Sequence, residues 1–286
     1  MISWYGYSLA ALLLLGSQRF LYKVAAHHGF ASGRVTTVFM ATVTLLSCGL
    51  YLFQPHAQPS LYPLVMLSLA NSLSFTVSTR ANIEALRHLS AGIIFPLTRL
   101  SLACVVVVSL IWFDETLTTG QWLGMILAFS VIYLLSQEAR FDAASPQALR
   151  RGLGLVLVCI LCGTVASVSS KLAAVSTDKA AFMALSYLVG TLFSGLTSRV
   201  KKNTPPRQSW WPTVALGGAM GVLNFLGFYA FLNALESGPL SAIILITGMH
   251  FIIAMVLSVL IYREAVTWRR VAAMVLTVGT VVLLKA

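Results

Sequence analysis

The sequence predicts an all-α integral membrane protein in which ten transmembrane helices form two inverted repeats of five. Three observations lead to this prediction. Hydrophobic residues make up 58% of the 286-residue chain and charged residues 9%, far below the roughly 25% charge of a soluble domain. Ten apolar segments come close to the length that a helix needs to cross a bilayer. The two halves of the chain also resemble each other at a nearly constant offset.

The apolar segments are bounded by charged and turn-forming residues. They cover 4–22, 35–53, 62–83, 91–113 and 121–136 in the first half, and 152–173, 180–198, 212–235, 241–262 and 271–284 in the second. The fifth and tenth segments are short for a full span. The long segments do not alternate apolar and polar residues, which favours helices over a membrane barrel. We therefore assign the first repeat to 1–136, a polar linker to 137–150 and the second repeat to 151–286.

Matching polar residues support the internal repeat, because matches between leucines or valines are common by chance in apolar sequence. An offset of 149 residues aligns Glu115 with Glu264, after the fourth helix of each half. An offset of 148 aligns the Lys-x-Ala-Ala stretches that begin at Lys23 and Lys171. Each repeat has an odd number of helices, so the second repeat enters the membrane from the opposite side. Such an inverted repeat is common in secondary transporters.

The distribution of basic residues supports the inversion independently. The loop at 54–60 has no lysine or arginine, whereas its counterpart at 199–207 has four. Equivalent loops with opposite charge lie on opposite sides of a membrane. The loops after the odd-numbered helices hold thirteen basic residues, and the other side, with both termini, holds three. Because basic loops stay in the cytoplasm, this count predicts termini that face outward.

Composition and motifs exclude several other classes of protein. The net charge of +11 includes no basic run that alternates with aromatic residues, so we expect no nucleic-acid surface. The four cysteines lie within apolar segments, where packing is expected instead of a disulfide framework. No serine-nucleophile, zinc-protease or phosphate-loop motif is present. The sequence therefore predicts no enzyme, no cofactor and no metal ion.

Arg99 is the most costly residue of the predicted membrane region, because it lies close to the middle of the fourth segment. A charge at that depth needs protein, water or a counter-ion around it, which makes it a functional-site hypothesis. Pro96, three residues earlier, removes a backbone donor and favours a kink. A guanidinium binds a carboxylate or phosphate through two hydrogen bonds, so we predict Arg99 as the anchor for an anionic solute. The alternative is a pair with Glu84 or with backbone carbonyls.

Two further arginines lie within the predicted helices. Arg80 precedes Glu84 by four residues, a spacing that favours a structural pair on one helix face, so Arg80 has both a structural and a binding interpretation. Arg19 lies near the end of the first segment, where it can extend to the membrane interface or bind solute. The corresponding positions of the second repeat are uncharged. We therefore expect an asymmetric site on a symmetric scaffold.

Uncharged polar side chains near the helix centres complete the predicted site. Asn71, Asn224 and His250 lie in apolar surroundings, and the repeat relates Thr98 to Thr247. Each is costly in hydrocarbon without a partner, so we expect each to face another helix or a cavity. Packing is the simpler interpretation for the threonines. His250 can couple transport to protons near neutral pH, and a hydrogen-bonded packing role is the alternative.

Short motifs at equivalent places resemble those of a known family. They are the Leu-Gly-Ser-Gln stretch at 15–18 followed by Lys23, the Ala-Leu pairs before the fourth and ninth helices, and the Glu-x-x-Thr stretches after them. With two five-helix halves, the chain resembles the drug/metabolite transporter superfamily, in its ten-helix EamA-like branch. The resemblance implies a carrier for small metabolites, often amino acids, with a cavity between the halves. It also implies termini in the cytoplasm, opposite to the charge rule.

We therefore expect a multi-pass protein of the plasma (inner) membrane that exports or exchanges a small polar metabolite with a negative group, an amino acid or organic acid. Its expected partners are that solute and the lipid bilayer, and the sequence leaves a monomer and a homodimer open. The alternative function is a membrane enzyme that acts on a phosphate-bearing, lipid-linked substrate. The predicted binding residues are Gln18, Arg19, Asn71, Arg80, Thr98, Arg99, Asn224, Thr247 and His250.

Overall fold

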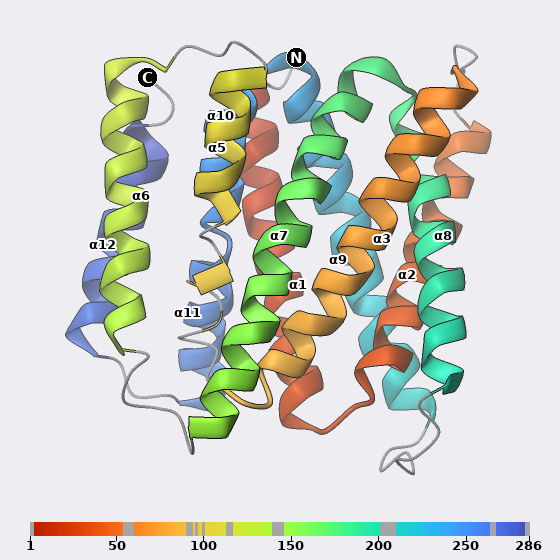
Figure 1. Cartoon of the computed structure of the whole chain (residues 1–286), viewed down its shortest axis with the longest axis horizontal. Coiled ribbons are helices and arrows are strands. Elements are labelled where there is room, and N and C mark those ends of the chain that lie inside the picture. The colour runs from red at the N-terminus through yellow and green to blue at the C-terminus, as the bar shows by residue number, and fades with distance from the viewer. Residues whose placement is uncertain are drawn as a thin grey trace.

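The computed structural model describes residues 3–53, 60–89, 94, 97–98, 101–112, 117–138, 146–200, 210–263 and 267–283. These residues form one helical bundle, to which both repeats contribute (Figure 1). The helices of the first repeat are α1 (Trp4–His27), α2 (Ser32–Phe53), α3 (Leu61–Ala85), α5 (Ser101–Trp112) and α6 (Thr119–Glu138). Those of the second are α7 (Pro146–Ser176), α8 (Lys179–Val200), α9 (Trp210–Ser237), α10 (Leu240–Gly248), α11 (Phe251–Tyr262) and α12 (Trp268–Leu283).

Several helices extend beyond the apolar segment that predicted them. α1 continues to His27, and a turn with Gly29 at a φ of 69° follows it, a conformation that glycine adopts without strain. α7 begins at Pro146, inside the segment assigned to the linker. Proline suits a first helical turn because an N–H at that position has no partner within the helix, so its absence costs nothing. Within the described residues, seven helical segments are long and apolar enough to cross a membrane, with α10 and α11 taken together.

The ninth predicted segment crosses the bundle as two half-helices. α10 ends at Gly248 and α11 begins at Phe251. Between them, the N–H groups of Met249 and His250 each bond a carbonyl three residues back, at 3.1 Å, which tightens the chain like a 3₁₀ turn. The repeat offset relates His250 to Ser101, where α5 begins. Broken helices near the membrane centre commonly build transporter binding sites, because their ends present backbone groups.

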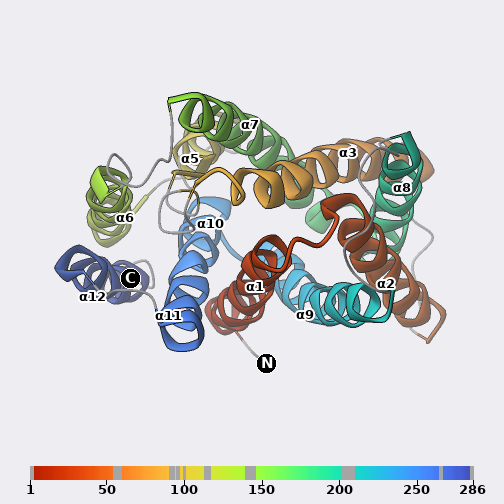
Figure 2. The same ribbon diagram turned by 90° about the horizontal axis from the view of Figure 1, so that it is seen from below.

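The principal helix contacts join one repeat to the other. α1 packs against α9, α3 against α7, α2 against α8 and α6 against α12 (Figure 2). Exchanging the two repeats turns the α1–α9 contact into the α7–α3 contact, and it turns each of the other two pairs into itself. The described helices are therefore arranged about a pseudo-two-fold axis, as an inverted repeat requires.

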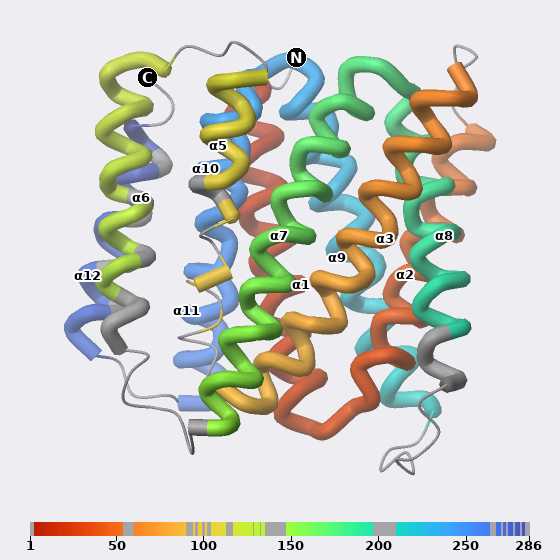
Figure 3. The backbone as a smooth tube through the Cα atoms, viewed as in Figure 1, coloured from red at the N-terminus to blue at the C-terminus, as the bar shows by residue number. Residues whose placement is uncertain are grey.

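The ends of the chain and the outer faces fit a membrane-spanning bundle. α1 begins and α12 ends at the same end of the bundle (Figure 3), as an even number of crossings demands. α6 and α12 stand at one edge and pack mainly against each other (Figure 2). Large apolar side chains cover the outer faces, for example Leu45, Leu161 and Val275, which are 74%, 60% and 66% exposed. A bilayer accommodates such a surface without the cost it has in water.

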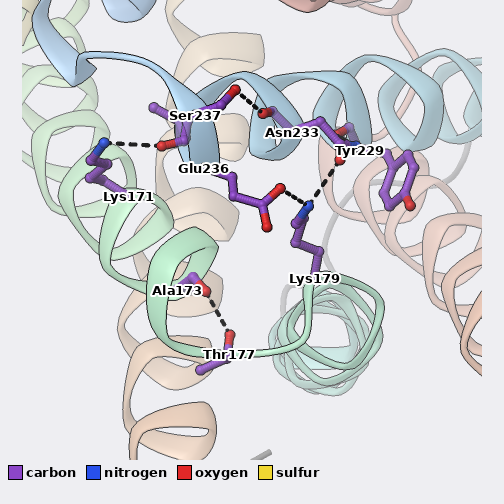
Figure 4. A network of polar contacts seen from close by, with 9 residues as sticks. Lys171, Ala173, Thr177, Lys179, Tyr229, Asn233, Glu236 and Ser237 are labelled. Atoms are coloured by element: carbon purple, nitrogen blue, oxygen red, sulfur yellow. Dashed lines mark hydrogen bonds and ion pairs between the residues drawn. The ribbon is translucent and has the colours of Figure 1, made fainter. Parts of the chain in front are cut away.

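Two lysines fix the end of α9 to the neighbouring helices (Figure 4). Lys171 of α7 donates from Nζ to the carbonyls of Leu235 and Gly238, at 3.0 and 2.9 Å. Lys179, at the start of α8, bonds the Oδ1 of Asn233 at 2.9 Å and forms an ion pair with Glu236. A helix C-terminus favours such cations because its last carbonyls have no partner within the helix.

Candidate functional site

A cavity of about 140 Å³ lies between the two repeats. Its walls come from α1, α3 and α5 of the first repeat and from α7, α9 and α10 of the second, together with the turn after α10. Seven of the eight predicted binding residues that the structure describes line it. They are Gln18, Arg19, Asn71, Thr98, Asn224, Thr247 and His250. The rest of the lining includes apolar side chains, among them Phe75 and Phe228, so the cavity has both polar and hydrophobic walls.

Arg19 lines this cavity from α1. Its Nε donates to Nε2 of His250 at 3.1 Å, and its guanidinium carbon lies 5.1 Å from the centre of the Tyr22 ring, within the range of a cation–π contact. Within the described part of the chain, no carboxylate pairs with Arg19. The two terminal nitrogens therefore retain their N–H donors, in the planar arrangement that binds a carboxylate or phosphate.

His250 is held in one tautomer by its two neighbours. Its Nε2 accepts from the Arg19 guanidinium, so this nitrogen carries no proton in the observed arrangement. Its Nδ1 contacts the carbonyl of Thr247, which can only accept a hydrogen bond, so the Nδ1–H is the donor. The ring is thus neutral, with its hydrogen on Nδ1. The hydroxyl of Thr247 donates to the Ile243 carbonyl at 2.7 Å, so that side chain is used within its own helix.

A chain of buried hydrogen bonds forms one wall of the cavity. Gln18 donates to the Tyr22 hydroxyl at 3.1 Å and accepts from Nδ2 of Asn224 at 3.1 Å. The Tyr187 hydroxyl donates to Oδ1 of the same asparagine. The chain joins α1, α8 and α9, and its shared hydrogen bonds make it rigid. Gln18 and Asn224 therefore shape the wall, and each uses one N–H and one oxygen lone pair in bonds within the protein.

Asn71 joins the two repeats on the other side. Its Nδ2 lies 2.9 Å from the Ala166 carbonyl and 2.8 Å from Oγ of Ser170. Both partners belong to α7, so this amide fixes α3 against α7. Thr98 also lines the cavity. Its backbone carbonyl accepts a hydrogen bond from Oγ of Ser101 at 2.9 Å.

Asn82 lines the cavity and was missed by the sequence reasoning. Its side chain is 1% exposed, and its Oδ1 has no hydrogen-bond partner among the described residues. A signal for it was present, because Asn82 follows Asn71 by eleven residues, about three helical turns, and so shares its face of α3. Cys159 and Ser78 also line the cavity, and the Cys159 thiol donates to the Ser78 carbonyl at 3.4 Å.

The structure describes Arg80 and Glu84 away from the cavity, and it does not describe Arg99 or Pro96. Arg80 does not line the cavity. Glu84 forms an ion pair with Arg87 at 3.3 Å and accepts a hydrogen bond from Ser32, and its proposed pair with Arg80 stays a prediction. Arg99, and Pro96 before it, lie outside the described residues. No group of three or more metal-binding side chains occurs among the residues searched, which are those that the structure describes.

A cavity between two interlocked repeats, with a broken helix and buried polar groups in its walls, defines a membrane transporter of the inverted-repeat class. The sequence profile of the EamA-like transporter family matches residues 2–137 and again residues 150–285. The chain therefore belongs to the EamA-like transporter family, within the drug/metabolite transporter superfamily. The ten-helix inverted-repeat prediction is confirmed, and the alternative of a membrane enzyme is excluded, because the proteins of this family are transporters.

The comparison with solved structures concerns the fold alone. Several solved structures match, and one of them, a crystal structure, does so with a TM-score of 0.74 at 17% sequence identity; that match covers 100% of this chain and 99% of the other. Identity this low carries the fold and leaves the solute open. No protein of curated function matches the sequence.

Proposed function

We propose that this transporter carries a small solute with a carboxylate group, an amino acid or organic acid, and exports or exchanges it across the plasma (inner) membrane. The observation that supports this is Arg19, a cation in the cavity whose terminal nitrogens have no carboxylate partner within the described residues. A cation within a membrane costs ~2.5–3.5 kcal/mol or more on insertion scales. A solute that supplies the negative charge removes this cost while it is bound.

The neighbours of Arg19 favour an anionic solute over a cationic one. His250 accepts a hydrogen bond from Nε of Arg19, and the Tyr22 ring packs against the guanidinium. The two terminal nitrogens have no hydrogen-bond partner among the described residues. No aspartate or glutamate lines the cavity among the described residues. A cationic solute would therefore meet repulsion from Arg19 without a compensating acid.

The size and lining of the cavity limit the rest of the solute. Its volume of about 140 Å³ is close to that of an engineered cavity that binds benzene. Phe75, Phe228 and Phe231 supply apolar surface, so the solute combines its negative group with a small hydrophobic part. Arg99 is proposed as a second ligand of the negative group. Its neighbour in the sequence, Thr98, lines the cavity.

Direct binding to the purified protein tests this function. Hexanoate and hexanamide differ in charge but share size and shape, so the acid should raise the melting temperature and the amide should not. Arg19→Gln should abolish the effect of hexanoate, whereas Arg19→Lys should keep part of it, because lysine retains the charge and loses the planar fork. Equal stabilisation by the acid and the amide contradicts the proposal.

A further inference from the structure

A buried acceptor at the wall of the cavity has no hydrogen-bond donor among the residues that the structure describes. Asn82 lies in α3, three residues before the helix ends, and its side chain is 1% exposed. Its Oδ1 has no hydrogen-bond partner among the described residues. The residue nevertheless lines the cavity. Buried acceptors are nearly always paired in native proteins, so an unpaired one calls for a partner from outside the chain.

The other amide side chains of the cavity are used by the protein itself. Gln18 and Asn224 bond each other and two tyrosines. Asn71 directs its amide to the backbone and hydroxyls of α7. Among the described amides that line the cavity, Asn82 is the one whose oxygen is both fully buried and without a hydrogen-bond partner. The Ser78 carbonyl already accepts a hydrogen bond from the Cys159 thiol, so it is a weaker candidate than Asn82 for accepting a hydrogen bond from a solute.

We propose that Asn82 Oδ1 accepts a hydrogen bond from an ammonium or hydroxyl group of the solute, and so selects acids that carry a donor over simple carboxylic acids. This inference rests on the proposed function, in which Arg19 binds the carboxylate. Arg19 and Asn82 then form two unlike poles of one site, a cation on α1 and an acceptor on α3. A solute without the donor leaves Oδ1 unpaired, which is the condition under which hydrogen-bonding sites discriminate most strongly.

A series of six-carbon compounds tests this selection on the purified full-length protein. Hexanoate carries no donor, whereas norleucine, 2-hydroxyhexanoate and 6-aminohexanoate carry one at the second or last carbon. Hexylamine carries a donor and no carboxylate. We expect at least one donor-bearing acid to bind about tenfold or more tightly than hexanoate, and the position of its donor locates Asn82 relative to the carboxylate.

Substitutions assign the preference to Asn82. Asn82→Leu keeps the approximate size without an acceptor, so the preference should disappear, and continued binding of hexanoate reports a folded protein. Asn82→Asp keeps an acceptor and should retain the preference for the amino acid. Asn233→Leu is the matched control, because this asparagine bonds Lys179 at the end of α9 and does not line the cavity. Its preference should equal that of the wild type.

The outcomes separate this inference from the proposed function. Persistence of the preference in Asn82→Leu, or its absence from the wild type while hexanoate binds, overturns the role of Asn82 and leaves the proposed function standing. Binding of hexylamine that Asn82→Leu abolishes, with no binding of hexanoate, supports the acceptor and overturns the carboxylate site. No binding by any compound of the series overturns both.

Discussion

Arg19 and His250 determine each other's state through one hydrogen bond. The guanidinium is permanently charged, and its Nε donates to Nε2 of His250, so the ring is neutral while the contact lasts. Among the described residues that line the cavity, Arg19 then carries the positive charge. His250 acts as a positioning residue that directs the guanidinium. The proton-coupling role considered for His250 requires that this hydrogen bond first break.

Substitution of His250 separates positioning from packing. Glutamine offers a carbonyl oxygen that can accept from Arg19, whereas leucine fills space and accepts nothing. We expect His250→Leu to raise the KM for the transported acid about tenfold with little change in kcat, the cost of about one charged hydrogen bond. His250→Gln should stay within about threefold of the wild type. Initial rates in proteoliposomes measure both constants, and equal KM values for the two variants contradict the positioning role.

Arg99 carries the prediction that depends on sequence alone. Arg99→Ala should abolish transport while expression and folding remain nearly intact, since the residue is proposed as a ligand of the solute. Arg99→Lys should restore transport only in part, because the two-pronged contact is lost. Uptake by reconstituted variants, normalised to folded protein, decides this. Wild-type transport by the alanine variant refutes the assignment.

Polarity in an apolar segment indicated several of the residues that line the cavity, but not what each one does there. Gln18, Asn71 and Asn224 line it as expected, yet their amides are used by other helices. Asn82 was missed although it satisfies the same criterion. The difference depends on which partner each side chain meets across helices, and residues as far apart as Gln18 and Asn224 give no local sign of meeting.

At the scale of elements, equivalent polar contacts hold the ends of α3 and α9, but the two repeats use different residues for them. In the second repeat, Lys179 holds Asn233 and Glu236 at the end of α9. The repeat offset relates these two residues to Glu84 and Arg87 at the end of α3, where Glu84 accepts from Ser32 and Arg87 donates to the Phe30 carbonyl at 2.7 Å. In each repeat, the connection between the first and second helices is thus bonded to the end of the third helix. The two sets of contacts lie at opposite ends of the bundle.

The two lysines at the end of α9 should differ in their contribution to stability. Lys171 bonds two backbone carbonyls and is part-buried, so Lys171→Met should cost about 1–3 kcal/mol. Lys179 pairs with a Glu236 side chain that is 55% exposed, and exposed pairs contribute about 0–1 kcal/mol. Melting temperatures in detergent should therefore fall by several degrees for Lys171→Met and less for Lys179→Ala. The reverse order contradicts this ranking.

Helix bounds were predictable where composition changes and not where tertiary contacts decide. The segment at 241–262 is apolar almost throughout, and its break is marked in the sequence only by Gly248 and His250. His250 stabilises the break through its contacts with the Thr247 carbonyl and with Arg19, and the contact with Arg19 needs the folded chain. α7 likewise starts inside the predicted linker, because a helix continues through polar residues when nothing ends it.

At the scale of the whole molecule, charge is distributed unequally between the two ends of the bundle. Lys171 and Lys179, at the end that holds the termini, are engaged with carbonyls and an acid. The described basic residues near the opposite end are Lys23, Arg34, Arg87, Arg150, Arg151, Arg263 and Arg269. The charge rule therefore still predicts that this second end faces the cytoplasm and that the termini face outward, against the orientation that the family resemblance implies.

Cysteine labelling decides the orientation. In a cysteine-free background, Ser60→Cys, just before α3, should react with an impermeant maleimide from outside intact cells. Asn203→Cys, in the basic loop beyond the described residues, should react only after the membrane is opened. The opposite pattern shows that the family orientation holds and that the charge rule fails for this protein.

The inverted repeat was predictable because polar matches such as Glu115 with Glu264 are rare in apolar sequence. The interlocking of the repeats was not, since no pattern within α1 indicates that its partner is α9. That interlocking creates the cavity and brings Arg19 to His250, residues that the chain separates by 231 positions.

Counterflow in proteoliposomes tests most directly whether Arg19 binds the carboxylate of a transported solute. Vesicles loaded with an unlabelled acid that binds the purified protein should accumulate the labelled acid transiently and release it chemically unchanged. Arg19→Gln should show no accumulation, while Arg151→Gln, an exposed arginine at the start of α7, should match the wild type. Normal counterflow by Arg19→Gln, or conversion of the acid into another product, contradicts a carboxylate carrier with Arg19 at its centre.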